Sequence, residues 1–107
     1  PAVVTGAGLA RRLTTSFGYL TKKGFCDLGG ACRIFPVVFG ETGSRFSDAL
    51  DVKMLNDFAT YMQTDDGTHA AIPNMIWWCW NANSGDTGGI VADNWLDVSV
   101  LWGGGGS

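Results

Sequence analysis

The 107 residues are enough for one small domain, and an apolar content of 46% supplies a core, which excludes a disordered segment. The net charge is −3 and the seven Lys and Arg are scattered, so no basic stripe is available to bind nucleic acid. No apolar run approaches the ~20 residues that span a bilayer, which argues against a membrane partner.

The first predicted element is a helix over residues 6–22, in which apolar residues recur at helical spacing. Its apolar face consists of Leu9, Leu13, Phe17 and Leu20. Residues 24–33 are expected to form a loop in which Cys26 and Cys32 flank a Gly-Gly turn. A disulfide across this turn would favour an oxidising, secreted setting, and two reduced thiols are the alternative.

A first strand is expected over residues 34–39, a continuous apolar run with Pro36 near its start. Uninterrupted apolar character is typical of a parallel strand that is covered on both faces. Asp48 can cap a second helix after the polar stretch that follows. The inner face of this helix is expected to consist of Leu50, Met54, Leu55, Phe58, Tyr61 and Met62.

A second apolar strand is expected over residues 72–80, after a loop that contains the only histidine, His69, which is expected to be solvated. Cys79 is expected to be buried in this strand and unpaired. Residues 81–89 have the composition of a loop, 90–91 that of a short extended piece, and 97–102 are ambiguous.

The order helix–strand–helix–strand, without polar alternation in the strands, predicts an α/β fold with a parallel pair. Two strands cannot close a barrel, and a free pair would leave two unpaired edges. The sequence therefore predicts that further strands of this sheet are missing from the chain. The Gly/Ser tail at 103–107 is expected to be a linker or tag remnant, with a natural Gly-rich tail as the alternative.

Glu41, the only glutamate, directly follows the first predicted strand. A carboxylate at that position points into the crevice at the carboxyl end of a parallel sheet, where α/β active sites gather. An exposed loop glutamate is the alternative. The second strand contains Trp77, Trp78 and Trp80, whose indole faces suit either core filling or stacking against a sugar ring.

Two strings carry a resemblance to a known family. They are Pro-Val-Val-Phe-Gly-Glu-Thr-Gly at 36–43 and Trp-Trp-Cys-Trp-Asn-Ala-Asn-Ser-Gly-Asp-Thr-Gly-Gly at 77–89. Together they resemble strands seven and eight of the (β/α)₈ barrel of glycoside hydrolase family five, the cellulase family. The resemblance covers about residues 17–95, and algal members share the Gly-Phe-Cys…Cys-Arg loop. It implies that residues 1–102 are the C-terminal part of a TIM barrel, containing helix six, strand seven, helix seven and strand eight.

The resemblance also implies roles for single residues. Glu41 matches the nucleophile of a retaining endo-β-1,4-glucanase, and Trp78 matches the tryptophan at the cleavage point, whose following peptide bond is often cis. The loop that contains Asn81 and Asp86 matches the wall of the cleft, and Trp80 joins them as a substrate-binding residue. The sequence departs from the family where Cys79 replaces a common Ser and Thr42 replaces a common Phe.

The acid/base partner of such a nucleophile is absent from this chain. In the family it is the Glu of an Asn-Glu-Pro motif, and no such motif occurs here. The resemblance therefore implies a secreted chain that recognises β-glucan or cellulose, needs a complementary barrel fragment for activity, and is inactive alone. A non-catalytic carbohydrate-binding or structural module is the alternative. No cofactor is implied, and no His, Cys or acidic cluster has metal-ligand spacing.

Overall fold

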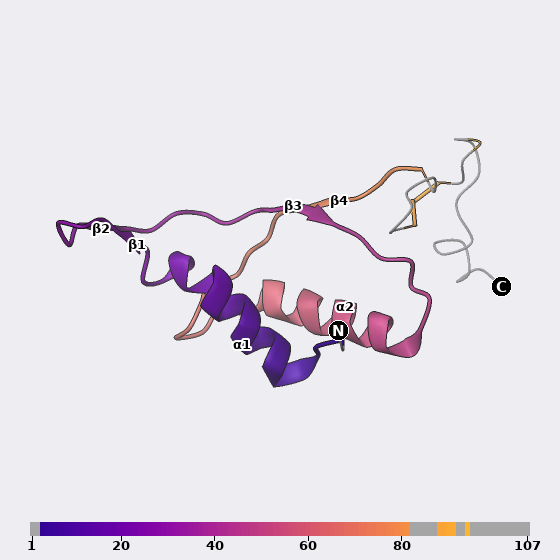
Figure 1. Ribbon diagram of the computed structural model, residues 1–107, viewed down its shortest axis with the longest axis horizontal. Helices are drawn as coiled ribbons and strands as arrows, with labels where there is room; N and C mark the ends of the chain where they lie inside the picture. Colours follow the sequence, from indigo (N-terminus) through magenta and orange to yellow (C-terminus); the bar gives the residue numbers. More distant parts are fainter. Residues whose placement is uncertain (1–2, 82–87, 92–93, 95–107) are drawn as a thin grey trace.

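The computed structural model describes residues 3–81, 88–91 and 94 of the chain (Figure 1). Two helices lie along one side of a pair of parallel strands, and a small antiparallel hairpin extends from one end. The elements are α1 (Gly6–Ser16), the 3₁₀ helix η1 (Gly18–Thr21), β1 (Phe25–Cys26), β2 (Cys32–Arg33), β3 (Phe39–Thr42), α2 (Ala49–Gln63) and β4 (Met75–Trp77). A parallel pair of strands joined by one helix is present, as predicted, while the β1–β2 hairpin is an addition to the predicted order helix–strand–helix–strand.

The first helix is shorter than the sequence pattern predicts. α1 ends at Ser16, because Phe17 leaves the helical region (φ −157°, ψ −22°) and the chain continues as η1. The apolar spacing continues through this break, so the pattern alone did not reveal it. Leu9 is buried, and the ring of Phe17 packs edge-on against that of Phe39, with centroids 5.2 Å apart. The predicted apolar face is therefore used, although two separate elements supply it.

Residues expected to form a loop instead contain the β1–β2 hairpin, in which Phe25 pairs with Arg33 and Cys26 with Cys32. A disulfide joins Cys26 to Cys32, which is the pair that the sequence analysis proposed. Asp27 closes the turn, because its carboxylate accepts hydrogen bonds from the N–H groups of Gly29 at 2.8 Å and Ala31 at 3.0 Å. The hairpin thus makes a closed turn that projects from the helix layer.

The first predicted strand is displaced along the chain. Residues 34–38 form no ladder, and β3 begins only at Phe39. Pro36 cannot donate to a ladder, and the chain opposite this stretch carries Pro73, which cannot donate either. Full burial of the predicted strand is also wrong, since Ile34 and Phe35 are 61% and 44% exposed.

The second helix matches its predicted start. The carboxylate of Asp48 accepts a hydrogen bond from the N–H of Asp51 at 2.9 Å, the expected N-cap of α2. Most of the predicted inner face is at least partly covered, and Tyr61 is 4% exposed. Leu50 is an error of the prediction, because it lies in the first turn of the helix and is 56% exposed.

The second strand is also shorter than predicted and is only partly covered. β4 spans three residues, and Ile72 lies buried just before it, held by a backbone hydrogen bond to Met62. Ile76 points away from its neighbours Met75 and Trp77 because side chains alternate along a strand, and it is 59% exposed. The face of the sheet that carries Ile76 is therefore bare of covering elements among the described residues.

No helix in the described part of the chain is long and apolar enough to cross a membrane.

Candidate functional site

Glu41 lies inside β3 rather than after it, because the strand is displaced toward the C-terminus. β3 and β4 run parallel, with Phe39 opposite Met75 and Thr42 opposite Trp77 and an irregularity in register between these pairs. Glu41 is exposed and stands one residue before the end of its strand. Glu41 therefore lies near the carboxyl end of a parallel pair, as predicted, although the predicted end of the strand at residue 39 was wrong.

Trp78 is placed beside the same edge by the ladder. Its backbone N–H donates to the carbonyl oxygen of Thr42 at 2.7 Å, so this hydrogen bond joins the residue after Glu41 to Trp78 itself. The indole of Trp78 is 47% exposed, and the peptide bond from Trp78 to Cys79 is cis, as the family resemblance implies. The structure thus brings the carboxylate and an exposed indole to neighbouring positions at one end of the sheet.

The backbone that follows Glu41 is anchored by Ser44, which sequence reasoning did not single out. Its hydroxyl, buried with the rest of the residue, donates to the carboxylate of Asp51 and accepts from the N–H of Phe46 at 2.9 Å. Its carbonyl oxygen accepts from the N–H of Gly88 at 3.4 Å. Ser44 therefore ties the segment after Glu41 to α2 and to the chain after β4. Only its place among small polar residues hinted at this role.

The other tryptophans of the second string have different environments. Trp77 is half-buried and stacks on Phe46, with ring centroids 5.7 Å apart and planes 16° apart, so it fills space beneath the site. Trp80 is 56% exposed and stays available to a ligand. Of the two uses of indole that the sequence left open, Trp77 fits core filling and Trp80 remains exposed as stacking would require.

Asn81, expected in the wall of the cleft, is buried. It is 9% exposed and forms an isolated parallel bridge with Val91, whose N–H donates to the carbonyl oxygen of Trp80 at 2.7 Å. Cys79 is a free, half-buried thiol that contacts the carbonyl oxygen of Asn81 at 3.0 Å. The expectation for Asp86 lies outside the described residues.

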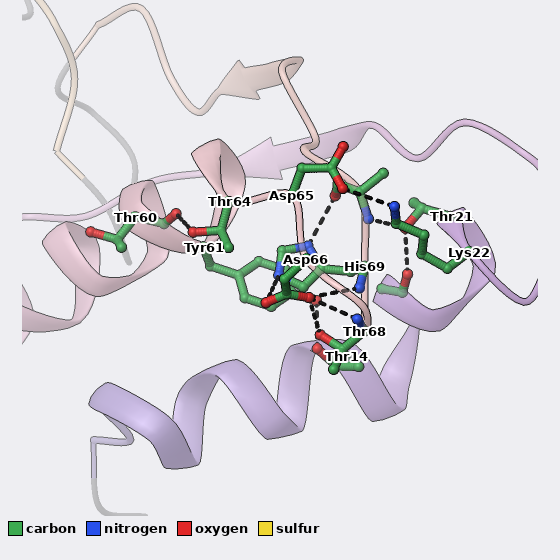
Figure 2. Close-up of polar contacts among 12 residues, drawn as sticks. Thr14, Thr21, Lys22, Thr60, Tyr61, Thr64, Asp65, Asp66, Thr68 and His69 are labelled. Carbon is green, nitrogen blue, oxygen red and sulfur yellow. Dashed lines mark hydrogen bonds and ion pairs between the residues drawn. The ribbon is translucent and has the colours of Figure 1, made fainter.

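A second polar cluster surrounds His69 at the opposite end of the sheet (Figure 2). The expectation of a solvated histidine was wrong: His69 is 2% exposed, and its ring stacks on Tyr61 at 3.8 Å between centroids. Its Nδ1 lies 2.9 Å from the carbonyl oxygen of Ala70, and the Tyr61 hydroxyl bonds that of Thr14 at 2.9 Å. Burial raises the pKa of Tyr61. The cluster joins α1, α2 and the loop before β4, which is a structural role.

The carboxylate of Asp66 makes the stability of this cluster depend on pH. It accepts hydrogen bonds from the hydroxyl of Thr68 at 2.6 Å and from its N–H at 2.8 Å, which lower the pKa of Asp66 from 3.8 to about 2. Because the pKa is lowered on folding, this stabilisation is complete above about pH 4 and is lost as the pH falls toward about 2.

We expect Thr68→Val to raise the pKa of Asp66 toward its ordinary value, because the hydroxyl donor is the largest cause of the shift. Stability at neutral pH falls in this variant, and the further loss in acid becomes smaller than in the parent chain. Urea midpoints measured from neutral pH down to about pH 2 check this expectation. Equal acid losses in the two proteins would contradict it.

Among residues 3–81, 88–91 and 94, no group of three or more His, Cys, Asp or Glu side chains is arranged to hold a metal ion. In the described part of the chain, the carboxyl end of β3 and β4 offers one exposed carboxylate, that of Glu41, beside the exposed indoles of Trp78 and Trp80. A lone carboxylate can act as a nucleophile or as a base. It cannot supply both carboxyl groups of a retaining glycosidase, which stand ~5 Å apart.

Comparison with known proteins finds a similarity to a secreted bacterial enzyme. The chain is 32% identical over 77 residues to the major extracellular endoglucanase of Xanthomonas campestris pv. campestris, with 63% of this chain aligned. The aligned part covers 15% of the length of that relative. No protein-family model matches the chain. The similarity supports a relationship to the glycoside hydrolases.

Proposed function

We propose that this chain is the C-terminal part of a (β/α)₈ barrel of glycoside hydrolase family five, in which β3 and β4 are strands seven and eight. In the whole barrel, Glu41 is the nucleophile of a retaining endo-β-1,4-glucanase and Trp78 is a stacking surface for the sugar. The substrate is β-glucan or cellulose, and the setting is extracellular. The similarity to an extracellular endoglucanase supports both statements.

The observation that carries the proposal is the shared position of Glu41 and Trp78. Glu41 lies in β3 and Trp78 directly follows β4, the parallel neighbour of β3, and the Trp78 N–H donates a hydrogen bond to the Thr42 carbonyl oxygen. Catalytic residues of (β/α)₈ barrels come from the carboxyl ends of several strands. An indole at this place offers an apolar plane to the C–H face of a pyranose ring, while the neighbouring carboxylate faces the anomeric carbon.

The chemistry proposed for Glu41 has two steps. Its carboxylate attacks the anomeric carbon as the glycosidic bond breaks, and the leaving oxygen takes a proton from a second carboxyl group. Water then hydrolyses the glycosyl-enzyme, with the second group acting as base. That second group belongs to the missing strands, since Glu41 is the only glutamate of the chain. General acid assistance is worth ~10²–10⁴-fold, so the chain alone is expected to be inactive.

The exposed apolar surface supports the placement in a larger barrel. Side chains such as Ile34 and Ile76 are 61% and 59% exposed, in segments with the composition of buried strands. Each would be covered if further strands extended this sheet and closed it. The bare face that carries Ile76 is then the inside of the barrel, which layers of side chains fill.

A glucan-binding module without chemistry is the second candidate, and the exposure of two indoles favours it. Trp78 and Trp80 are 47% and 56% exposed, and stacking needs only an open indole face. Slowed migration of the purified chain in a gel that contains soluble β-glucan would reveal such binding. Loss of the effect in Trp78→Ala would assign it to this residue.

The proposal is tested by mixing the chain with a complementary fragment that carries the missing strands and the Asn-Glu-Pro glutamate. We expect the mixture to release reducing sugar from soluble β-glucan, while each fragment alone stays at background. The control is a complementary fragment whose Asn-Glu-Pro glutamate is replaced by Gln, which must associate without hydrolysis. A mixture that forms a stable complex but stays inactive would contradict the catalytic proposal and leave the binding module.

A further inference from the structure

Phe46 lies in the turn between β3 and α2 and has a left-handed backbone, with φ +53°. Within the part of the chain that the structure describes, it is the only residue other than glycine with a positive φ. This conformation is costly for a bulky aromatic residue and is usually occupied by Gly or Asn. Such outliers persist where surrounding contacts hold them, and they cluster at functional sites. The turn alone therefore does not explain why residue 46 is a phenylalanine.

Ser44 holds the backbone of Phe46 in this conformation. The N–H of Phe46 donates to the hydroxyl oxygen of Ser44 at 2.9 Å, and the Ser44 hydroxyl donates to the carboxylate of Asp51 in the first turn of α2. Ser44 is 6% exposed, so these hydrogen bonds are shielded from water. They use only the backbone of Phe46, and a glycine at this position could make them equally well.

The ring of Phe46 stacks on the indole of Trp77, with centroids 5.7 Å apart and planes 16° apart. Stacked aromatic pairs contribute stabilisation beyond the area that they bury. Both rings line a hollow of about 370 Å³ between α2 and β4, so the stack lies on the helix side of the sheet. Trp77 is the last residue of β4, and Trp78 follows it directly. The costly residue at position 46 thus contacts the immediate neighbour of Trp78.

The segment that carries Trp78 is joined to the segment that carries Glu41 at two points. The first is the hydrogen bond from the Trp78 N–H to the Thr42 carbonyl oxygen at 2.7 Å. The second is the stack of Phe46 on Trp77, on the helix side. Trp77 and Trp78 project to opposite faces, because side chains alternate along a strand. A single hydrogen bond would leave the end of β4 free to turn about it, whereas two connections fix its orientation.

We propose that Phe46 is a positioning residue that holds the indole of Trp78 at a fixed place relative to Glu41. This inference rests on the proposed function, in which the sugar stacks on Trp78. Phe46 does not touch the sugar, since its ring lies on the helix side. Without that ring, Trp77 can turn in the hollow and the end of β4 moves with it. The sugar then loses its stacking surface in the ground state and in the transition state alike, which raises KM and leaves kcat unchanged.

Nuclear magnetic resonance of the chain alone gives the first test. Phe46→Gly removes the ring and accepts the left-handed backbone without strain. We expect the order parameter of the Trp78 indole N–H to fall below about 0.6, the range of flexible groups, while Phe46→Tyr keeps the ring and the parent value. Phe17→Leu is the matched control, because it removes an edge-on contact with Phe39 rather than the stack on Trp77. It should leave the Trp78 indole as rigid as in the parent chain.

Hydrolysis of soluble β-glucan by the reconstituted barrel gives the second test. We expect Phe46→Gly to raise KM about tenfold with kcat within about threefold of the parent, and Phe46→Tyr to restore KM. Phe17→Leu should lower stability without raising KM. A merely structural role for Phe46 predicts instead that KM follows stability in all three variants. Unchanged amide signals in α1 and α2 show that a variant is folded, and Phe46→Asn, which also tolerates a positive φ, replaces Phe46→Gly if that variant does not fold.

Two outcomes would overturn the proposal. They are a Trp78 indole that stays rigid in Phe46→Gly, and a KM that rises as much in Phe17→Leu as in Phe46→Gly. A parent complex without hydrolysis would contradict the proposed function instead. The order parameter is measured on the chain alone, so it decides the role of Phe46 in that case as well.

Discussion

Replacement of Glu41 by Gln should reduce hydrolysis of β-glucan by the reconstituted barrel on the order of 10⁴–10⁶-fold, as expected for loss of a covalent nucleophile. Gln keeps the shape of the side chain but cannot form the glycosyl-enzyme. Because Glu41 is exposed in this chain, replacing its carboxylate by an amide should not impair assembly of the complex. Reducing-sugar release at equal concentrations of complex measures the effect.

The control is Asp65→Asn, which removes an exposed carboxylate in the loop before β4, where it pairs with Lys22 at 2.8 Å. This loop is at the opposite end of the strands from Glu41, so activity should stay within about twofold of the parent, given the small energies of exposed ion pairs. Turnover that persists in Glu41→Gln would show that another group attacks the sugar.

Gly24→Ala should cause the largest loss of stability of any single methyl addition in the hairpin region. Gly24 has φ +78°, and a β-carbon there would lie 2.5 Å from the carbonyl oxygen of Arg33 and 2.7 Å from its carbonyl carbon. The left-handed conformation alone costs about 1–3 kcal/mol for a residue with a side chain. The clash adds to this, because both atoms belong to the backbone of β2 and cannot turn away.

Gly30→Ala separates the two contributions. Gly30 has a similar φ of +86°, but a β-carbon there would meet nothing within 4 Å. We expect this variant to show only the conformational cost, and Gly24→Ala to unfold at clearly lower urea concentration. Matching urea midpoints for the two variants would contradict the close approach of Gly24 to the β1–β2 hairpin.

The parts of the fold that depend on local chemistry could be predicted from the sequence. Asp48 begins α2 because its carboxylate satisfies a free N–H of the first turn. The Cys26–Cys32 pairing follows from a turn that returns the chain on itself. The parallel pairing of β3 and β4 follows from two apolar runs joined by one helix.

The strand boundaries could not be predicted, because they depend on partners rather than on propensity. Residues 34–38 have strong strand character, yet a ladder needs donors on both sides, and Pro36 and Pro73 remove them. For the same reason Glu41 lies in the strand and not in the loop. The prediction of burial was wrong where no described element covers the strand, as at Ile76, which is 59% exposed.

The environment of His69 was hidden from sequence reasoning for a different reason. A histidine in a polar loop has the composition of a solvated residue, and only the tertiary contact with Tyr61 encloses it. Ser44 is similar, since its contact with Gly88 joins segments that are distant in the sequence. By contrast, Glu41 and Trp78 could be selected as candidate site residues from the sequence, because each stands in a recognisable string at or directly after an apolar strand segment.

Covalent labelling of the reconstituted barrel by a fluorinated glucan-type inactivator tests the central proposal most directly. A retaining enzyme attacks such a compound and then hydrolyses the glycosyl-enzyme very slowly, so the sugar stays on the nucleophile. We predict that peptide mass mapping finds the sugar on Glu41, within Phe39–Thr42, and on no other residue of this chain. Time-dependent inactivation with the label on a different carboxylate, or with Glu41 unlabelled, would contradict the assignment of Glu41 as the nucleophile.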